Sequence, residues 1–265
     1  MSSDTHTMKK QHTCNIILLL ALFLFAAAGT ALAATPGEIK VQADSAYAAR
    51  KYEQARDLYL QLTKQGQSLG IYYNLACTYY RLEDYPNSVL WFERAAKLDP
   101  SDEDVKHNLA MARGKTIDRI TPVHSMLFVS AWHSLTRYMS VTGWAYTAIY
   151  LFVFTLLMTG IYLWSQNIIL RKIGFFSAII GILLCLLSNI CAYSQRHYNQ
   201  NHSAGILMQP AVTVKSTPEK TGNDLFVIHQ GTRVEIKDDS MKDWVEISIA
   251  DGKSGWIQRN TFQEI

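Results

Sequence analysis

The sequence predicts a multidomain membrane protein in which an all-α repeat array, a two-helix transmembrane hairpin and a small all-β barrel follow one another. Three observations predict this order. A helical segment recurs with a period near 34 residues, two long apolar runs carry no charge, and short segments rich in β-branched residues form the C-terminal part. Of the 265 residues, 49% are apolar and only 18% are charged, a balance that favours membrane content.

Residues 1–34 have the features of a secretory signal peptide. A Lys-Lys pair precedes an uninterrupted apolar core at 16–28, and Ala31 and Ala33 suit an A-x-A cleavage site. An uncleaved anchor is the alternative, and a later start methionine would shorten the basic region. Either interpretation places the chain from residue 35 onward outside the cytoplasm.

Two later apolar runs predict transmembrane helices at 143–164 and 173–194. Each is long enough to cross about 30 Å of hydrocarbon, and a helix satisfies its own backbone hydrogen bonds in lipid. The loop at 165–172 holds Arg171 and Lys172 and no acid, so the positive-inside rule places it in the cytoplasm. Both soluble parts then lie on the outer side, which is the periplasmic face of a bacterial inner membrane.

The segment before the first span, residues 124–140, has large apolar residues at helical spacing. Phe128, Trp132, Leu135 and Met139 are separated by polar positions. This pattern fits an amphipathic helix on the membrane surface, and it fits a helix packed against the rest of the protein equally well.

The helical region at 35–115 repeats itself. Residues 38–66 align on 71–99 at an offset of 33, and Asn74-Leu75-Ala76 aligns on Asn108-Leu109-Ala110 at an offset of 34. This period, with two helices per unit, resembles the tetratricopeptide repeat. The family's pattern of large, small and proline positions falls on Tyr72, Leu75, Ala76, Tyr79, Tyr85, Ser88, Phe92, Ala95 and Pro100. We expect repeats at 36–68 and 69–102, followed by a capping helix at 103–115.

The same pattern separates core residues from candidate site residues. Small residues such as Ala76 and Ser88 let two helices approach closely, and the aromatic residues fill the space between helices, so most of them belong to the core. The resemblance implies that the first helix of each repeat lines a concave, peptide-binding face. The residues that it places there are Tyr73, Asn74, Cys77, Tyr80, Arg81, His107, Asn108 and Met111. Asn74 and Asn108 stand where such repeats often hydrogen-bond a peptide backbone, and a solvated or helix-capping asparagine is the alternative.

Residues 205–265 change to short β-branched segments separated by turn residues. Polar and apolar residues alternate at 232–237 and 244–247, which is typical of half-buried strands. Asp251-Gly252 is a strong hairpin signal. These patterns predict five short strands and a small barrel.

The segment Gly255-Trp256-Ile257, with its surroundings, resembles a bacterial SH3-like domain. We expect Trp256 in the core and Gly255 at a close approach between strands. Phe226 and Trp244 either rim a recognition groove or belong to the core. Such domains bind peptides or cell-wall fragments, and the residues here do not select between these ligands.

No motif for catalysis, metal binding or nucleic-acid binding emerges from the sequence. It contains no Gly-rich phosphate loop, no HExxH, no GxSxG and no CxxC motif. Residues 35–115 hold 11 basic and 11 acidic side chains, and residues 206–265 hold 7 and 9, so neither part is a basic surface for nucleic acid. We expect a protein that is not an enzyme, has no cofactor or metal, and acts through protein partners and the lipid bilayer.

The order of segments over the whole chain resembles the BatE family of the Bat aerotolerance operon. The resemblance includes the segments "RKIGFF", "AYSQ" and "TVKSTP…DLFVIHQGTRVEI…ADGKSGWI". It implies a membrane-bound partner of von Willebrand A-type Bat proteins, encoded with a MoxR-type ATPase and linked to aerotolerance or envelope stress. The expected function is a periplasm-facing scaffold, and the alternative is a sensor that binds peptidoglycan through the SH3-like domain.

Overall fold

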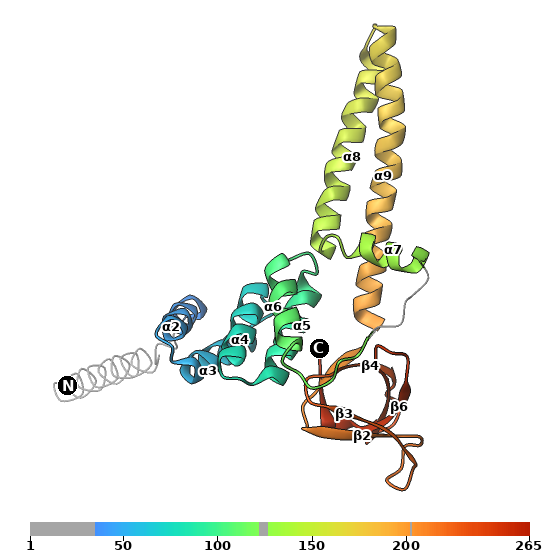
Figure 1. Cartoon of the computed structure of the whole chain (residues 1–265). Coiled ribbons are helices and arrows are strands. Elements are labelled where there is room, and N and C mark those ends of the chain that lie inside the picture. The colour runs from blue at the N-terminus through green and yellow to red at the C-terminus, as the bar shows by residue number, and fades with distance from the viewer. Residues whose placement is uncertain (1–34, 122–126, 202) are drawn as a thin grey trace, which may run out of the picture.

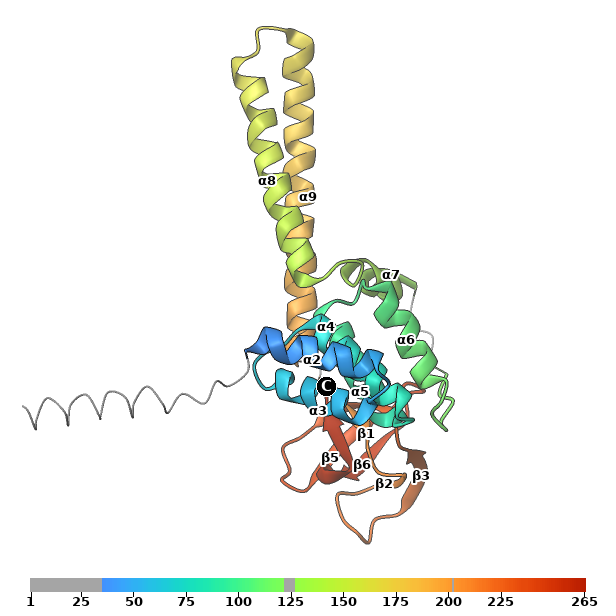
Figure 2. The ribbon, with the colours of Figure 1, turned by 90° about the vertical axis from the view of Figure 1, so that its left-hand side faces the viewer.

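A computed structural model describes residues 35–121, 127–201 and 203–265. The predicted signal peptide and residues 124–126 of the predicted surface helix lie outside these ranges. Figure 1 shows a helical array, a long two-helix hairpin and a C-terminal sheet, with the array and the sheet at the same end of the hairpin. Figure 2 shows the same arrangement after a quarter turn.

Five helices form the array. They are α2 (Pro36–Ala48), α3 (Tyr52–Thr63), α4 (Leu69–Arg81), α5 (Tyr85–Leu98) and α6 (Glu103–Arg113). Side chains cap three of their N-termini: Thr35 forms a capping box with Glu38, and Asp84 and Asp102 accept hydrogen bonds from backbone N–H groups of α5 and α6. Each cap satisfies a backbone donor that the helix itself leaves unpaired.

The two helix pairs share one turn geometry, which confirms the repeat. Arg50 and Glu83, which are 33 residues apart, both adopt a positive φ, at 59° and 61°. Directly after them, the backbone N–H of Lys51 donates to Ala46 O at 2.9 Å, and that of Asp84 donates to Tyr79 O at 3.0 Å. The recurrence of a left-handed residue at the same offset shows that the sequence period is a structural period.

The core of the array follows the small-and-large pattern. Ala76 and Ser88 are fully buried, and the Ser88 hydroxyl donates to the Ala76 carbonyl at 2.9 Å. Tyr59 and Phe92 are among the largest side chains that are completely enclosed. Such contacts between α4 and α5 are close because neither facing residue is larger than serine.

The hairpin consists of α8 (Val141–Trp164) and α9 (Ile168–Asn201), preceded by the short helix α7 (Leu127–Thr136). A Cβ atom at Gly174 would lie 2.8 Å from the carbonyl oxygen of Met158, so the two long helices touch backbone to backbone there. Because α9 begins at Ile168, Arg171 and Lys172 lie in its first turns and not in the loop where the sequence placed them. The connection itself is short, at residues 165–167.

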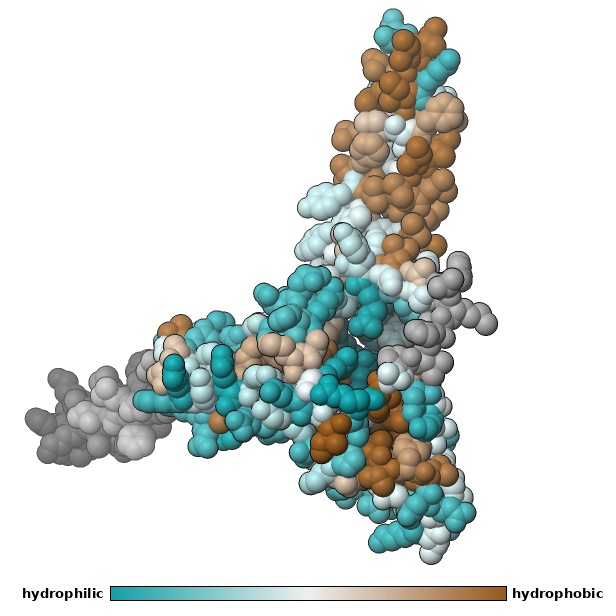
Figure 3. Space-filling view, in the orientation of Figure 1, coloured by the Kyte–Doolittle hydropathy of each residue, from teal (hydrophilic) through white to brown (hydrophobic). Residues whose placement is uncertain are grey.

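The outer surface of the hairpin is apolar. Both helices are long and apolar enough to cross a membrane, and most of their large side chains face outward. Figure 3 shows this surface as predominantly brown, with hydrophilic residues at its tip and paler ones toward the array. The helix α7 packs against α9, where the His133 and Tyr198 rings meet edge-on with their centroids 5.8 Å apart.

Seven antiparallel strands form the C-terminal sheet, in the order β3-β2-β6-β5-β4-β1-β7. They are β1 (Ala204–Leu207), β2 (Ala211–Lys215), β3 (Asp224–His229), β4 (Arg233–Asp238), β5 (Trp244–Ser248), β6 (Ser254–Gln258) and β7 (Phe262–Glu264), with a 3-10 turn at Arg259–Thr261 between β6 and β7. The sequence predicted five of these strands. The other two, β1 and β7, pair with each other and are too short to show alternation.

The core of the sheet contains Val214, Val245, Ile247 and Ile257. A Cβ atom at Gly255 would lie 2.6 Å from a methyl carbon of Val214, which explains the glycine as a point of close approach. Trp256 is not part of this core, so the expectation for it was wrong. It is half-buried on the opposite face of β6 from Ile257, because neighbouring residues of a strand point to opposite faces.

Candidate functional site

The candidate site is the face formed by the first helices α2, α4 and α6, called here the first-helix face. Asn108 of α6 donates from Nδ2 to the Tyr73 hydroxyl of α4 at 2.9 Å. Asn74 of α4 donates from Nδ2 to Asp44 Oδ1 of α2 at 3.4 Å. These contacts connect all three first helices, so the structure brings both predicted asparagines onto one face.

The sequence did not point to Asp44, which is the most connected side chain of this face. Its carboxylate accepts hydrogen bonds from the Tyr59 hydroxyl at 2.6 Å and from Lys40 Nζ at 2.7 Å, in addition to that from Asn74. Burial acts to raise the pKa of Asp44, but the hydrogen bonds from Lys40 and Tyr59 outweigh it and leave the pKa below its ordinary value. The carboxylate is therefore ionised at neutral pH, and the ion pair with Lys40 offsets its charge.

One feature of the sequence could have identified Asp44. Asp44 lies 33 residues before Cys77, so the repeat offset places it on the same face as the residues predicted on α4. The first repeat lacks most of the signature residues, and this hid the correspondence.

Tyr73 and Cys77 form the central part of the first-helix face. Burial, together with the neighbouring Cys77, raises the pKa of Tyr73 to about 12. Burial also raises the pKa of the Cys77 thiol, although Tyr73 and Arg81 oppose this. Both groups are neutral at pH 7, so they can donate or accept hydrogen bonds but carry no charge and little nucleophilic character.

The remaining predicted residues lie at the borders of the face. The Tyr80 ring stacks edge-on against Tyr85 with centroids 5.6 Å apart, which leaves it half-buried. Arg81 is exposed and hydrogen-bonds Tyr47 of α2. His107 and Met111 are exposed on α6, and Met111 retains 42% of its accessible surface.

The polar atoms left over on this face are acceptors. Among the described residues, Asn108 uses Nδ2 to hydrogen-bond Tyr73 and, at 2.8 Å, the Asp104 carbonyl, and Asn74 also uses Nδ2. Among residues 35–121, 127–201 and 203–265, no hydrogen bond is made by Oδ1 of either asparagine. An amide oxygen has two lone pairs, so each can accept hydrogen bonds from the N–H groups of an extended peptide.

Phe226 and Trp244, the candidate groove of the C-terminal sheet, are not brought together. Phe226 lies on β3 and packs against the core of the sheet, with Lys253 Nζ 5.9 Å from its ring centroid. Trp244 lies on β5, opposite Gln258, and is half-buried. The strands β2 and β6 separate β3 from β5, so the two rings belong to different parts of the sheet.

Within the described residues, no group of three or more His, Cys, Asp or Glu side chains is arranged to hold a metal ion. The polar side chains of the first-helix face are hydrogen-bonded to one another, and none forms the nucleophile–base pair that covalent catalysis needs. This arrangement is suited to binding.

The array and the sheet form one body. Ile206 of β1 is fully buried in the core of the array, and Met208 and Ile265 pack beside it. Arg94 of α5 donates to the Glu264 carbonyl at 2.6 Å. Glu93 pairs with Arg113 of α6 and with Arg233 of β4, the latter at 3.5 Å. No pattern in the sequence indicated this docking.

Comparison with known protein families identifies part of the array. The tetratricopeptide repeat family matches residues 70–102, which cover α4, α5 and the proline that follows them. No curated protein matches the chain. The match falls on the helix pair that carries Tyr73, Asn74, Cys77, Tyr80 and Arg81. The chain therefore contains a tetratricopeptide repeat, a helical module typical of protein–protein interaction.

Proposed function

We propose that this protein is a membrane-anchored, periplasm-facing scaffold that docks an extended segment of a partner protein on its first-helix face. The observation that carries the proposal is the pair Asn74 and Asn108, on successive first helices, with both Oδ1 atoms unpaired within the described residues. Asn74 and Asn108 are 34 residues apart, so each repeat supplies one hydrogen-bond acceptor. Acceptors at regular intervals suit the regularly spaced N–H groups of an extended peptide.

The chemistry of the face suggests what kind of segment it accepts. Val41 of α2 and Met111 of α6 are exposed apolar side chains at its two ends, and Asp44 and Lys40 add an ion pair. An extended segment with apolar side chains complements the exposed Val41 and Met111. The array is short, so we expect modest affinity.

Membrane anchoring is supported by the outward-facing apolar surface of α8 and α9. Arg171 and Lys172 lie at the tip of the hairpin, and the positive-inside rule places that tip in the cytoplasm. The array and the C-terminal sheet lie at the other end, on the outer side. The resemblance to the BatE family suggests von Willebrand A-type Bat membrane proteins as partners and a role in aerotolerance or envelope stress.

The docking proposal is tested by recovery of partner proteins from solubilised membranes. The variant Asn74→Ala/Asn108→Ala removes both acceptors, whereas Gln54→Ala/Gln61→Ala removes two exposed amides of α3 and serves as the matched control. We expect the first variant to lose partners that the control and the wild type retain. Equal recovery by both variants would exclude the first-helix face as the docking site.

The topology proposal is tested separately with alkaline phosphatase fusions, because this enzyme is active only in the periplasm. A fusion after residue 115 should be active, and a fusion at Arg171 should be inactive. The opposite pattern would reverse the orientation without affecting the docking proposal.

A second candidate function, binding of peptidoglycan, is favoured by the half-buried aromatic rings of the C-terminal sheet. Trp244 and Trp256 are partly accessible, and rings of this kind can stack on sugars. Co-sedimentation of the detergent-solubilised full chain with purified sacculi tests this function. Binding that Trp244→Ala or Trp256→Ala abolishes would support it, and a wild-type protein that stays in the supernatant would exclude it.

A further inference from the structure

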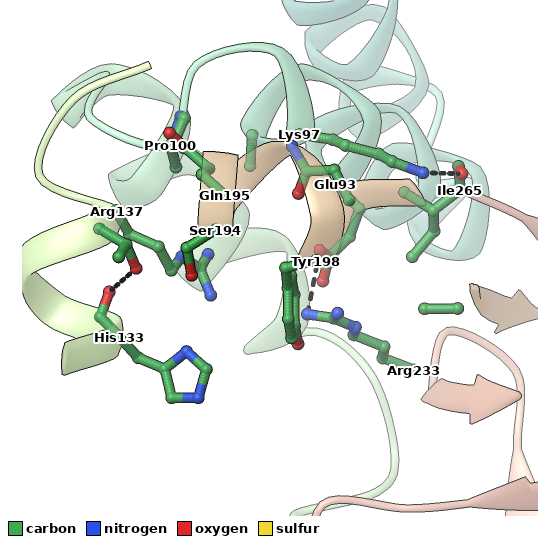
Figure 4. Close-up of a pocket in the computed structure, with 14 residues that line it drawn as sticks. Glu93, Lys97, Pro100, His133, Arg137, Ser194, Gln195, Tyr198, Arg233 and Ile265 are labelled. Carbon is green, nitrogen blue, oxygen red and sulfur yellow. Dashed lines mark hydrogen bonds and ion pairs between the residues drawn. The ribbon is translucent and has the colours of Figure 1, made fainter. Parts of the chain in front are cut away.

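A pocket with several polar and charged lining residues lies where the array, the hairpin and the C-terminal sheet meet. It has a volume of about 90 Å³ and is lined by side chains of α5, α9 and β4 and by residues at the end of α7. Figure 4 shows Glu93, Arg137, Gln195, Tyr198 and Arg233 around it. None of these residues was singled out by the sequence, and none belongs to the first-helix face.

Two buried polar atoms in this pocket lack a partner. They are Oε1 of Gln195 and Nε of Arg233, and within the described parts of the chain these are the buried side-chain nitrogen and oxygen atoms without a hydrogen bond. Gln195 is only 5% exposed. One atom is an acceptor and the other is a donor, and it is unfavourable to bury either without a partner. Their presence in one pocket indicates a ligand that both donates and accepts hydrogen bonds.

The charges around the pocket favour an anionic group. Arg233 and Glu93 form an ion pair at 3.5 Å, and Glu93 also pairs with Arg113. Lys97 is held at the edge of the pocket, where it donates to a backbone oxygen of Ile265 at 3.1 Å. Arg137 makes no side-chain ion pair or hydrogen bond to any residue that the structure describes. The guanidinium groups of Arg137 and Arg233 can therefore both face a phosphate.

The pocket lies at a defined level of the hairpin. Ser194, Gln195, Tyr198 and Asn199 follow directly after the apolar run of α9, and Arg137 precedes α8 by a few residues. This part of the inference rests on the membrane insertion proposed above. With α8 and α9 in a bilayer, the pocket lies at the level of the lipid headgroups, where phosphates are abundant.

We propose that this pocket binds the headgroup of a glycerophospholipid that carries a hydrogen-bond donor next to its phosphodiester. The phosphate accepts hydrogen bonds from Arg137 and Arg233, and the headgroup N–H or O–H donates to Oε1 of Gln195. Phosphatidylethanolamine and phosphatidylglycerol have both the phosphate and a headgroup hydrogen-bond donor. Phosphatidylcholine has the phosphate but no donor, so it leaves the Gln195 oxygen unpaired. A bound lipid would join the array, the sheet and the hairpin at one point.

The test is retention of lipid by the purified full chain, measured by native mass spectrometry after exchange into each of the three lipids. We expect wild type to retain phosphatidylethanolamine and phosphatidylglycerol about tenfold better than phosphatidylcholine, since one hydrogen bond distinguishes them. Gln195→Met should lower the retention of phosphatidylethanolamine and phosphatidylglycerol to that of phosphatidylcholine. Arg137→Gln should lower the retention of all three lipids by about tenfold, because it removes a charged contact to the phosphate.

Arg196→Gln is the matched control, because Arg196 is an exposed neighbour of Gln195 that does not line the pocket. It should behave as wild type. Arg137 is exposed, so Arg137→Gln remains informative even if Gln195→Met fails to fold. Glycerophosphoethanolamine, added in excess, should displace the retained lipid if the headgroup is what the pocket binds.

Equal retention of all three lipids, or no effect of either pocket variant, would show that the pocket holds only water. Extraction of the membranes with alkaline carbonate separates this failure from that of the proposed anchoring. A protein that stays in the pellet but shows no lipid preference overturns the pocket alone. A protein that carbonate extracts overturns both the anchoring and the pocket.

Discussion

The carboxylate of Asp118 accepts a hydrogen bond from the Thr232 hydroxyl at 2.6 Å, across 114 residues of sequence. The same oxygen accepts the backbone N–H of His229 at 2.7 Å, and the second oxygen lies 2.8 Å from Nδ1 of that histidine. Asp118 follows the last helix of the array, and its partners lie at the turn between β3 and β4. One carboxylate thus fastens the end of the array to the C-terminal sheet.

We predict that Asp118→Asn weakens this docking at neutral pH. Burial acts to raise the pKa of Asp118, but the hydrogen bonds from Thr232 and His229 outweigh it, so the pKa is below its ordinary value. The stabilisation is complete above the pKa of an unfolded aspartate, about 3.9. It is lost as the pH falls through the lower folded value, because the unfolded state then binds the proton first.

Thermal unfolding in detergent measures this effect. At pH 7 we expect Asp118→Asn to lower the free energy of unfolding by about 1–3 kcal/mol, and below pH 3 the difference from wild type should shrink. Asp57→Asn, at an exposed carboxylate of α3, is the control. A difference that persists unchanged at low pH would argue that Asp118 acts through packing.

A second prediction concerns Glu93, whose side chain is 7% exposed between Arg113 and Arg233. Glu93→Gln leaves two guanidinium groups without their carboxylate, so we expect a loss of about 1–3 kcal/mol in the free energy of unfolding. The loss is limited because both arginines are partly exposed and can be hydrated. Glu103→Gln, at a carboxylate that is largely in solvent, should change the midpoint of thermal unfolding very little. If the two variants unfold alike, the buried ion pairs do not hold the array to the sheet.

A third prediction concerns the contact between α8 and α9. A side chain at Gly174 would collide with the backbone of Met158 and Tyr162, so Gly174→Val must push the helices apart. We expect it to lower the stability of the hairpin by about 1–3 kcal/mol, as is usual for overpacking. Gly160→Ala is the control, because its Cβ would meet only the Trp164 ring at an ordinary distance of 3.4 Å. Unfolding in denaturing detergent, followed by helical circular dichroism, measures the difference, and a stable Gly174→Val would contradict the close approach.

A fourth prediction concerns Cys77. Because burial raises the pKa of its thiol, little thiolate exists at pH 7.5, and we expect alkylation by iodoacetamide to be on the order of tenfold slower than for a free cysteine. The measurement uses a chain in which the other three cysteines are replaced. Met111→Cys, with Cys77 also replaced, supplies an exposed thiol on the same face as the reference. Equal rates at the two positions would show that the thiol at Cys77 is accessible and reactive.

The repeat and its register could be predicted because they depend on local rules. Small residues such as Ala76 and Ser88 recur at fixed spacing, and the spacing itself defines which residues of α4 face together. Asp44 was missed because the first repeat keeps the geometry without the signature residues. Trp256 was assigned to the wrong face because alternation fixes that it lies opposite to Ile257 but does not say which of the two is enclosed.

The docking of the array on the sheet could not be predicted for a different reason. Asp118 lies outside any periodic element, and its partners follow more than a hundred residues later. A single polar side chain in an irregular segment carries no pattern that identifies a distant partner. The same holds for Gln195 and Arg233, which are separated by the end of α9 and three strands and meet only in the folded protein.

The separation of Asp118 from Thr232 also sets an order of biogenesis. With the membrane topology proposed above, the array emerges first and can fold from contacts between neighbouring helices. Its site for the sheet stays uncovered until both spans are inserted and the last strand has been translocated. Ile206 of β1, which completes the core of the array, follows directly after the second span. The newly made array is thus an unfinished module that exposes apolar surface throughout this interval, and any chaperone that protects it must be able to leave when β1 arrives.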